Sequence, residues 1–172
     1  ATEKVETIHG GIQTKETGLR DMLVYDWYDR AALSDHFFTE PPDPDRLARG
    51  EVHEIGDFVD QPFTAELITA PGVVTARLAR TGGLWRDGRC QPVSIEKTVR
   101  VKGGERGFEV SWVYRNLSDA ALRAHVGIES HVNLLAANAP DRYVVVDGCR
   151  VQPEILGAAS QSEGIRWVAL VE

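Results

Sequence analysis

The stretch Val93-Ser-Ile-Glu-Lys-Thr-Val-Arg-Val101 alternates between two kinds of side chain, and this alternation decides the fold class. Its odd positions carry Val, Ile and one Lys, whereas its even positions carry Ser, Glu, Thr and Arg. Successive side chains of a β-strand point to opposite faces, so the pattern predicts a strand with one mainly apolar face. The run from Phe108 to Arg115 alternates in the same way, and Gly103-Gly104 indicates a turn between the two runs.

A third alternating run extends from Arg123 to Leu135, after a turn signal at 116–119. We predict that the three runs form an antiparallel meander within one sheet, because short turns join strands with one apolar and one polar face. The residues expected on the buried face are Ile95, Val99, Val110, Trp112, Ile128 and Val132. Those expected to be far more exposed are Glu96, Arg100, Glu109 and Glu129.

The rest of the chain also favours strands over helices. Asp43-Pro44-Asp45 predicts one capped helical turn through Ala48, because Asp accepts hydrogen bonds from the first free amides and Pro suits the first helical position. We therefore predict an all-β protein, an antiparallel β-sandwich forming a single domain over residues 1–172. The further strands are expected at 63–68, 73–80, 142–147 and 165–171.

Composition and charge exclude several classes of protein. With 172 residues, 42% of them hydrophobic, the chain can bury one sizeable core. Its net charge of −7 argues against nucleic acid or an anionic membrane as a partner, since both require a basic face. No apolar run approaches the roughly 20 residues of a membrane helix. Two cysteines, Cys90 and Cys149, form no disulfide framework or zinc motif, so we expect reduced thiols in a cytoplasmic protein without metal or cofactor.

No catalytic residue can be selected from the sequence. Ser34-Asp35-His36 places three triad residue types side by side, but a triad is built by spatial convergence and not by sequence adjacency. Carboxylates that could flank a glycosidic bond are abundant, and nothing distinguishes one pair. Gly82-Gly83 is interpreted as a turn and not as part of a phosphate-binding loop.

The polar face of the third run carries the candidate binding residues. On a strand, Glu129 and His131 are next-but-one neighbours, so they could share a ligand or act as a proton donor and acceptor. The alternative is a solvated outer face on which Glu129 pairs with Arg115 or Arg100 of neighbouring strands. Aromatic rings can stack on sugars but more often fill a core. The candidate carbohydrate-binding residues are His125, Glu129, His131, Asn133, Trp27 and Tyr28.

The chain resembles a known module over nearly its whole length, most strongly from Lys15 to Phe63. The matching segments are Lys15-Glu16, Tyr25-Asp-Trp-Tyr-Asp-Arg30, Ser34-Asp-His-Phe37, Gly56-Asp-Phe-Val59 and Gln61-Pro-Phe63, and Val126–Leu135 matches more loosely. They resemble the C-terminal β-sandwich of glycoside hydrolase family 57 enzymes, the 4-α-glucanotransferases and related α-amylases. The resemblance implies a galactose-mutarotase-like supersandwich. It also implies that the catalytic barrel, absent from this sequence, is the partner domain in the same polypeptide.

Two functions are compatible with this resemblance. The first is a non-catalytic accessory domain of an α-glucan-processing enzyme that supports the barrel and could contact α-glucan. The alternative is a stand-alone sugar-binding or mutarotase-like protein that uses the polar sheet face. Family members continue beyond the position matching Glu172, and the chain opens with Ala1, so we expect a cut-down segment or a naturally short relative.

The aromatic and acidic segment Tyr25–Phe38 is expected to face the barrel. Acidic residues outnumber basic ones by 11 to 4 between Arg20 and Asp60, so this region holds the excess negative charge. We expect its aromatic side chains to pack onto the sandwich and its polar ones to fix the turns through hydrogen bonds. The aromatic set is Trp27, Phe37 and Phe38, and the polar set is Asp26, Asp35 and His36.

Overall fold

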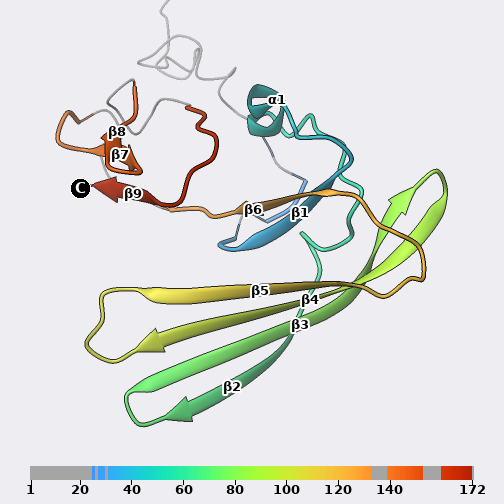
Figure 1. Ribbon diagram of the computed structural model, residues 1–172, viewed down its shortest axis with the longest axis horizontal. Helices are drawn as coiled ribbons and strands as arrows, with labels where there is room; N and C mark the ends of the chain where they lie inside the picture. Colours follow the sequence, from blue (N-terminus) through green and yellow to red (C-terminus); the bar gives the residue numbers. More distant parts are fainter. Residues whose placement is uncertain (1–24, 26, 30, 133–138, 153–159, 172) are drawn as a thin grey trace, which may run out of the picture.

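The computed structural model describes residues 25–171, apart from 26, 30, 133–138 and 153–159, and these residues form antiparallel sheets with one short helix (Figure 1). The predicted all-β sandwich is therefore confirmed. The elements are β1 (Ser34–Phe38), α1 (Pro44–Ala48), β2 (Thr64–Ala70), β3 (Val73–Arg86), β4 (Arg89–Lys102), β5 (Phe108–Asn116), β6 (His125–Glu129), β7 (Tyr143–Val146), β8 (Cys149–Arg150) and β9 (Val168–Val171).

The largest sheet has the strand order β2-β3-β4-β5, in which every neighbour in space is also the neighbour in sequence. Short turns fix this order. Asp87 and Gly88 both have positive φ, 50° and 72°, as the two-residue hairpin turn between β3 and β4 requires. The Pro71-Gly72 turn closes the hairpin of β2 and β3 at the pair Ala70–Val73. The strands predicted from alternation and turn signals are confirmed here.

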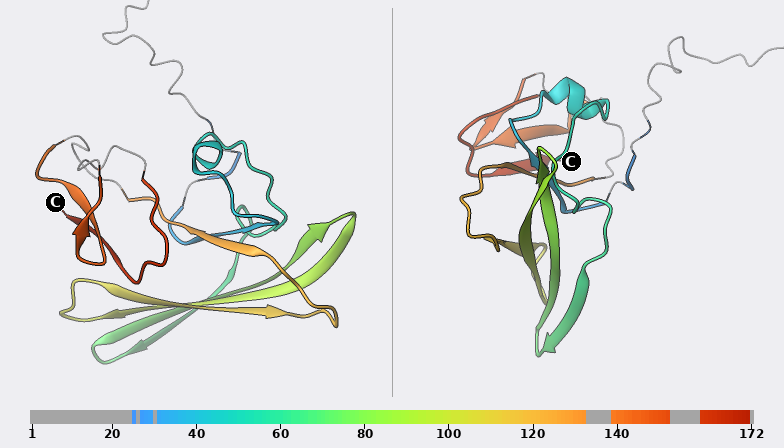
Figure 2. Two further views of the ribbon diagram at one scale, coloured as in Figure 1. Left: turned by 45° about the horizontal axis from the view of Figure 1, so that its top comes forward. Right: turned by 90° about the vertical axis from the view of Figure 1, so that its right-hand side faces the viewer.

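The third run of the expected meander lies in a different sheet. Strand β6 pairs antiparallel with β1, and Figure 2 shows these two strands as a separate layer facing the four-stranded sheet. After β5 the chain does not form a tight hairpin, because the Asn116 side chain holds a wider turn. Its Nδ2 donates to the Ala120 carbonyl at 2.7 Å, and its Oδ1 accepts from the Ser118 amide at 3.0 Å. The prediction of one continuous meander sheet was wrong at β6.

The core lies between these two layers. Its buried members come from β1, the segment before β2, β3 and β4: Phe37, Ile55, Phe58, Leu84, Val93 and Ile95. Trp112 is partly buried and packs against this cluster. The predicted burial of Ile128 and Val132 was wrong, since their exposed fractions are 46% and 58%. Strand β6, which carries Ile128, pairs with β1 and is not part of the four-stranded sheet. The expectation that Glu129 is far more exposed than Ile128 was also wrong, since the Glu129 side chain is only 28% exposed.

The prediction that Gly82 and Gly83 form a turn was wrong, because both residues lie inside β3. They allow the segment of Asp57 and Phe58 to lie directly on the strand. A Cβ atom at Gly82 would come within 2.9 Å of the Phe58 ring. The Asp57 carboxylate accepts a hydrogen bond of 2.9 Å from the Gly83 amide, which it can approach because Gly83 has no side chain.

Among the described residues, no helix has the length and apolar character needed to cross a membrane.

Candidate functional site

The imidazole of His36 on β1 lies between two carboxylates. Its Nδ1 is 3.3 Å from Glu54 Oε2, and its Nε2 is 3.1 Å from Glu129 Oε2. Alternation along β1 explains this position, because Asp35 and Phe37 point into the core while His36 points to the opposite side. Glu54 is held in turn by the Phe37 amide, which donates to its Oε1 at 3.1 Å. His36 thus ties β1 to β6 and to the segment before β2.

Glu129 is the centre of this cluster. The Tyr28 hydroxyl donates to Oε2 at 2.8 Å, and His131 Nε2 lies 2.8 Å from Oε1. Three of the predicted carbohydrate-binding residues, Tyr28, Glu129 and His131, are therefore in direct contact. We call the set Tyr28, His36, Glu54, Glu129 and His131 the Glu129 cluster.

The surroundings shift the pKa values of the two central groups in opposite directions. Burial alone would lower the pKa of His36, but hydrogen bonds and charge from Glu54 and Glu129 outweigh it and raise the pKa above 6.5. Burial alone would raise the pKa of Glu129, but hydrogen bonds from His131, Tyr28 and His36 lower it below 4.5. The cluster therefore favours an imidazolium between two carboxylates, with both ring nitrogens as donors.

These shifts predict how stability depends on pH. The pKa of His36 is higher in the folded than in the unfolded chain, so its contribution is complete below pH 6.5 and is lost as the pH rises through the raised value. The wild-type chain should lose stability relative to His36→Gln as the pH rises above 6.5, as measured by urea unfolding over a pH series. A difference that stays constant over this range would contradict the imidazolium assignment.

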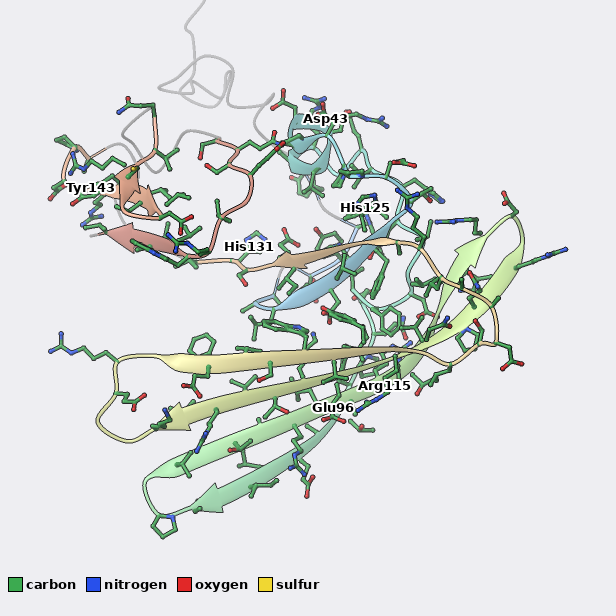
Figure 3. The ribbon with its side chains drawn as sticks, in the orientation of Figure 1. Asp43, Glu96, Arg115, His125, His131 and Tyr143 are labelled. Carbon is green, nitrogen blue, oxygen red and sulfur yellow. The ribbon has the colours of Figure 1, made fainter. Side chains whose placement is uncertain are left out.

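A hollow of about 430 Å³ adjoins the cluster, between β6 and the segment that contains α1. Asp43 caps α1 as predicted, accepting from the Arg46 amide at 3.0 Å. The helix presents Leu47 to the hollow. His125 also lines it, and Figure 3 shows His125 and His131 near opposite ends of β6. The other lining residues are His36, Phe38, Pro41, Pro42, Val126, Gly127, Ile128, Glu129 and Ser130.

Trp27 does not pack into the core. Its exposed fraction is 58%, and its ring meets Tyr28 edge-on with the ring centres 5.1 Å apart. The predicted burial of Trp27 was wrong, whereas that of Phe37 and Phe38 is confirmed at 3% and 4% exposure. An apolar ring face is thus available to a ligand or partner beside the Glu129 cluster. The predicted residues Asp26 and Asn133 lie outside the described residues.

Asp35 belongs to a separate, buried group behind the cluster. Its side chain forms an ion pair of 2.5 Å with Lys97 Nζ of β4 and accepts from the Tyr114 hydroxyl at 3.0 Å. Lys97 also donates to the Leu33 carbonyl at 2.7 Å, which secures the entry into β1 at a residue with a φ of 65°. Burial and the charge of Asp35 raise the pKa of Tyr114, so its hydroxyl stays a donor. This group joins the two layers.

The partners of Glu129 differ from those that the alternative interpretation, a solvated outer face, predicted. Neither Arg115 nor Arg100 pairs with Glu129, because β6 lies in a different sheet from β4 and β5. Arg115 lies 3.8 Å from Glu96 instead, on the four-stranded sheet (Figure 3).

The sequence did not reveal the role of Glu54, because nothing distinguished it from the other acidic residues nearby. The described residues contain no cluster of three or more His, Cys, Asp or Glu side chains suited to a metal ion.

Residues 1–166 match the family model described as α-amylase/4-α-glucanotransferase, C-terminal. The chain is 36% identical to a 4-α-glucanotransferase of Thermococcus litoralis over 128 residues, which cover 74% of this chain and 18% of that protein. It is 31% identical to an α-amylase of Pyrococcus abyssi, covering 76% of this chain and 18% of the relative. The crystal structure of the Thermococcus litoralis 4-α-glucanotransferase superposes with a TM-score of 0.56 at 28% identity, covering 80% of this chain and 20% of that one. The chain thus spans about a fifth of the length of these relatives.

Proposed function

Because the chain belongs to the family of C-terminal domains of α-amylases and 4-α-glucanotransferases, we propose that it is a non-catalytic accessory β-sandwich of an α-glucan-processing enzyme. In this proposal it supports a catalytic barrel of glycoside hydrolase family 57 in a cytoplasmic protein and contacts α-glucan. Its fold is of the galactose-mutarotase-like kind. The observation that carries the proposal is the family match over residues 1–166.

The chemistry of the Glu129 cluster supports a role without catalysis. Glycoside hydrolysis requires two carboxyl groups that flank the scissile bond and are free to exchange a proton or attack. Glu54 and Glu129 instead contact the same imidazole from opposite sides, at 3.3 Å and 3.1 Å. Since His36 neutralises part of their charge and occupies the space between them, a glycosidic bond cannot lie there.

Binding of sugar hydroxyls suits the same residues better. Glu129 and His131 offer hydrogen-bonding groups that are 28% and 34% exposed, and Trp27 presents an exposed ring nearby. An aromatic face beside a few fixed polar groups is a common way to hold a polar ligand with apolar patches. A glucosyl unit has this mixed character, with C–H groups on its ring faces and hydroxyls at its rim.

Trp27→Ala tests the contact with glucan. The change should alter the free energy of unfolding by less than about 0.5 kcal/mol, because the side chain is mostly exposed. It should weaken maltoheptaose binding roughly fivefold, which corresponds to about 1 kcal/mol, in isothermal titration calorimetry. Trp85→Ala is the matched control, since Trp85 is 53% exposed on β3 and lies outside the cluster and the hollow. Equal binding by both variants, or no binding by the wild-type chain, would contradict the glucan contact.

A second function is favoured by the contact of 2.8 Å between His131 and Glu129. A carboxylate and an imidazole at this distance could accept and donate the protons that open and close a sugar ring. A mutarotase-like protein would accelerate the exchange between the anomers of glucose, followed by polarimetry, and Glu129→Gln would abolish the acceleration. The accessory domain that we propose would leave the exchange rate unchanged.

A further inference from the structure

Strand β2 forms one edge of the four-stranded sheet and is exposed along its whole length. All seven of its residues are exposed, and β3 is its only neighbour among the described residues. The view in Figure 1 shows β2 at the border of the sheet, away from β1 and β6. An edge of this kind presents a row of unpaired backbone N–H and C=O groups that another strand can bind.

The hairpin turn defines which backbone groups are free. In a two-residue hairpin the closing pair, here Ala70–Val73, is hydrogen-bonded, and hydrogen-bonded pairs then alternate along the ladder. Residues 64, 66, 68 and 70 therefore direct their backbone groups towards β3. The groups of Ala65, Leu67 and Thr69 point outward, away from the sheet.

Most of the usual protections against edge pairing are missing from β2. Its sequence Thr-Ala-Glu-Leu-Ile-Thr-Ala contains no Pro, Lys or Arg, and its one charge, on Glu66, lies 3.8 Å from Arg77 of β3. The Leu67 side chain is 70% exposed. By contrast β5, the opposite edge, carries both Glu109 and Arg115. Native proteins place charged side chains, especially Lys, and Pro on free edges to prevent pairing. Strand β2 carries one charged side chain, Glu66, and neither Lys nor Pro, so its edge is only weakly protected against pairing.

We propose that β2 pairs antiparallel with β2 of a second copy of this chain, about a twofold axis at Leu67. In this register Leu67 faces its own copy and Ala65 faces Thr69, so every outward backbone group is used. Glu66 faces Ile68 of the other copy, and like charges do not meet. The interface is self-complementary, as twofold symmetry requires, and it joins two four-stranded sheets into one.

Sedimentation equilibrium of the whole chain tests the association. The mass should approach twice 19.0 kDa with increasing concentration. Leu67→Lys should give a monomer, because two ammonium groups would then face each other across the axis. Ile68→Lys is the matched control and should stay dimeric, since the new ammonium would face Glu66 of the other copy. A monomeric wild-type chain, or equal association of the two lysine variants, would overturn the proposal.

Disulfide trapping tests the register. Cys90 and Cys149 are exposed and are first replaced by Ser. Leu67→Cys should then form a covalent dimer under mild oxidation, because Cα atoms of a hydrogen-bonded antiparallel pair lie about 5.5 Å apart, within disulfide reach. Ala70→Cys should not, since the two copies of residue 70 would lie about 20 Å apart. Equal cross-linking at both positions, or none at position 67, would overturn the twofold register.

Discussion

Replacing Asp35 by Ala should lower the free energy of unfolding by about 3–5 kcal/mol, because the change leaves the Lys97 ammonium buried without its counter-ion. The side chains of Asp35 and Lys97 are 0% and 6% exposed, so water cannot take the place of the lost partner. The Tyr114 hydroxyl loses its acceptor as well. Urea unfolding followed by tryptophan fluorescence measures the effect.

The double variant Asp35→Ala, Lys97→Met separates the missing partner from a mere change of volume. It should recover part of the loss, because an apolar side chain no longer leaves a charge unpaired. Glu96→Ala is the control for an ion pair at the surface. It removes the contact of 3.8 Å with Arg115 and should cost no more than about 1 kcal/mol. A cost for Asp35→Ala as small as this would show that the buried pair does not hold the two layers together.

Phe58→Ala should also cost about 3–5 kcal/mol, because it leaves a cavity at the centre of the core. Phe58 is 1% exposed, and its ring centre lies 5.2 Å from that of Phe37 and 5.9 Å from the Arg80 guanidinium carbon. The Phe58 ring also packs on Gly82, which has no side chain that could fill the space left by the ring. Thermal and urea unfolding should both report the loss.

Phe108 provides the matched control for this second change. It is the same residue type on β5 but is 61% exposed, so Phe108→Ala should change stability by less than about 0.5 kcal/mol. Similar losses for the two variants would contradict the position of the core between β1 and the four-stranded sheet.

Local patterns were enough to predict that β2 to β5 exist and follow one another, but they ended β3 at Arg80, whereas it continues through Gly82 and Gly83 to Arg86. Alternation defined each strand, and Pro71-Gly72 and Gly103-Gly104 marked turns that leave little choice of neighbour. The same alternation defined β6 but could not define its partner, because strand pairing depends on contacts between residues far apart in sequence. The Asn116 turn and the contact between His36 and Glu129 decide that pairing, and neither has a distinctive sequence signal.

The candidate site was predictable only in part, because the sequence shows which residues are unusual but not which distant residues contact them. Tyr28, His36, Glu129 and His131 stood out as polar or aromatic residues in unusual runs, and the structure brings them together. Glu54 did not stand out, since only the direction of its side chain distinguishes it from other acids of the segment. Lys97 was visible as a charge on an apolar face, yet its partner lies 62 positions earlier, in another sheet.

The most direct test of the central claim is a product analysis. The purified chain is incubated with maltoheptaose, and the length distribution of the maltooligosaccharides is followed by chromatography. A non-catalytic accessory domain should leave maltoheptaose unchanged, with neither shorter nor longer products. The appearance of such products, abolished by Glu129→Gln, would show that this chain itself carries out the chemistry and would contradict the account.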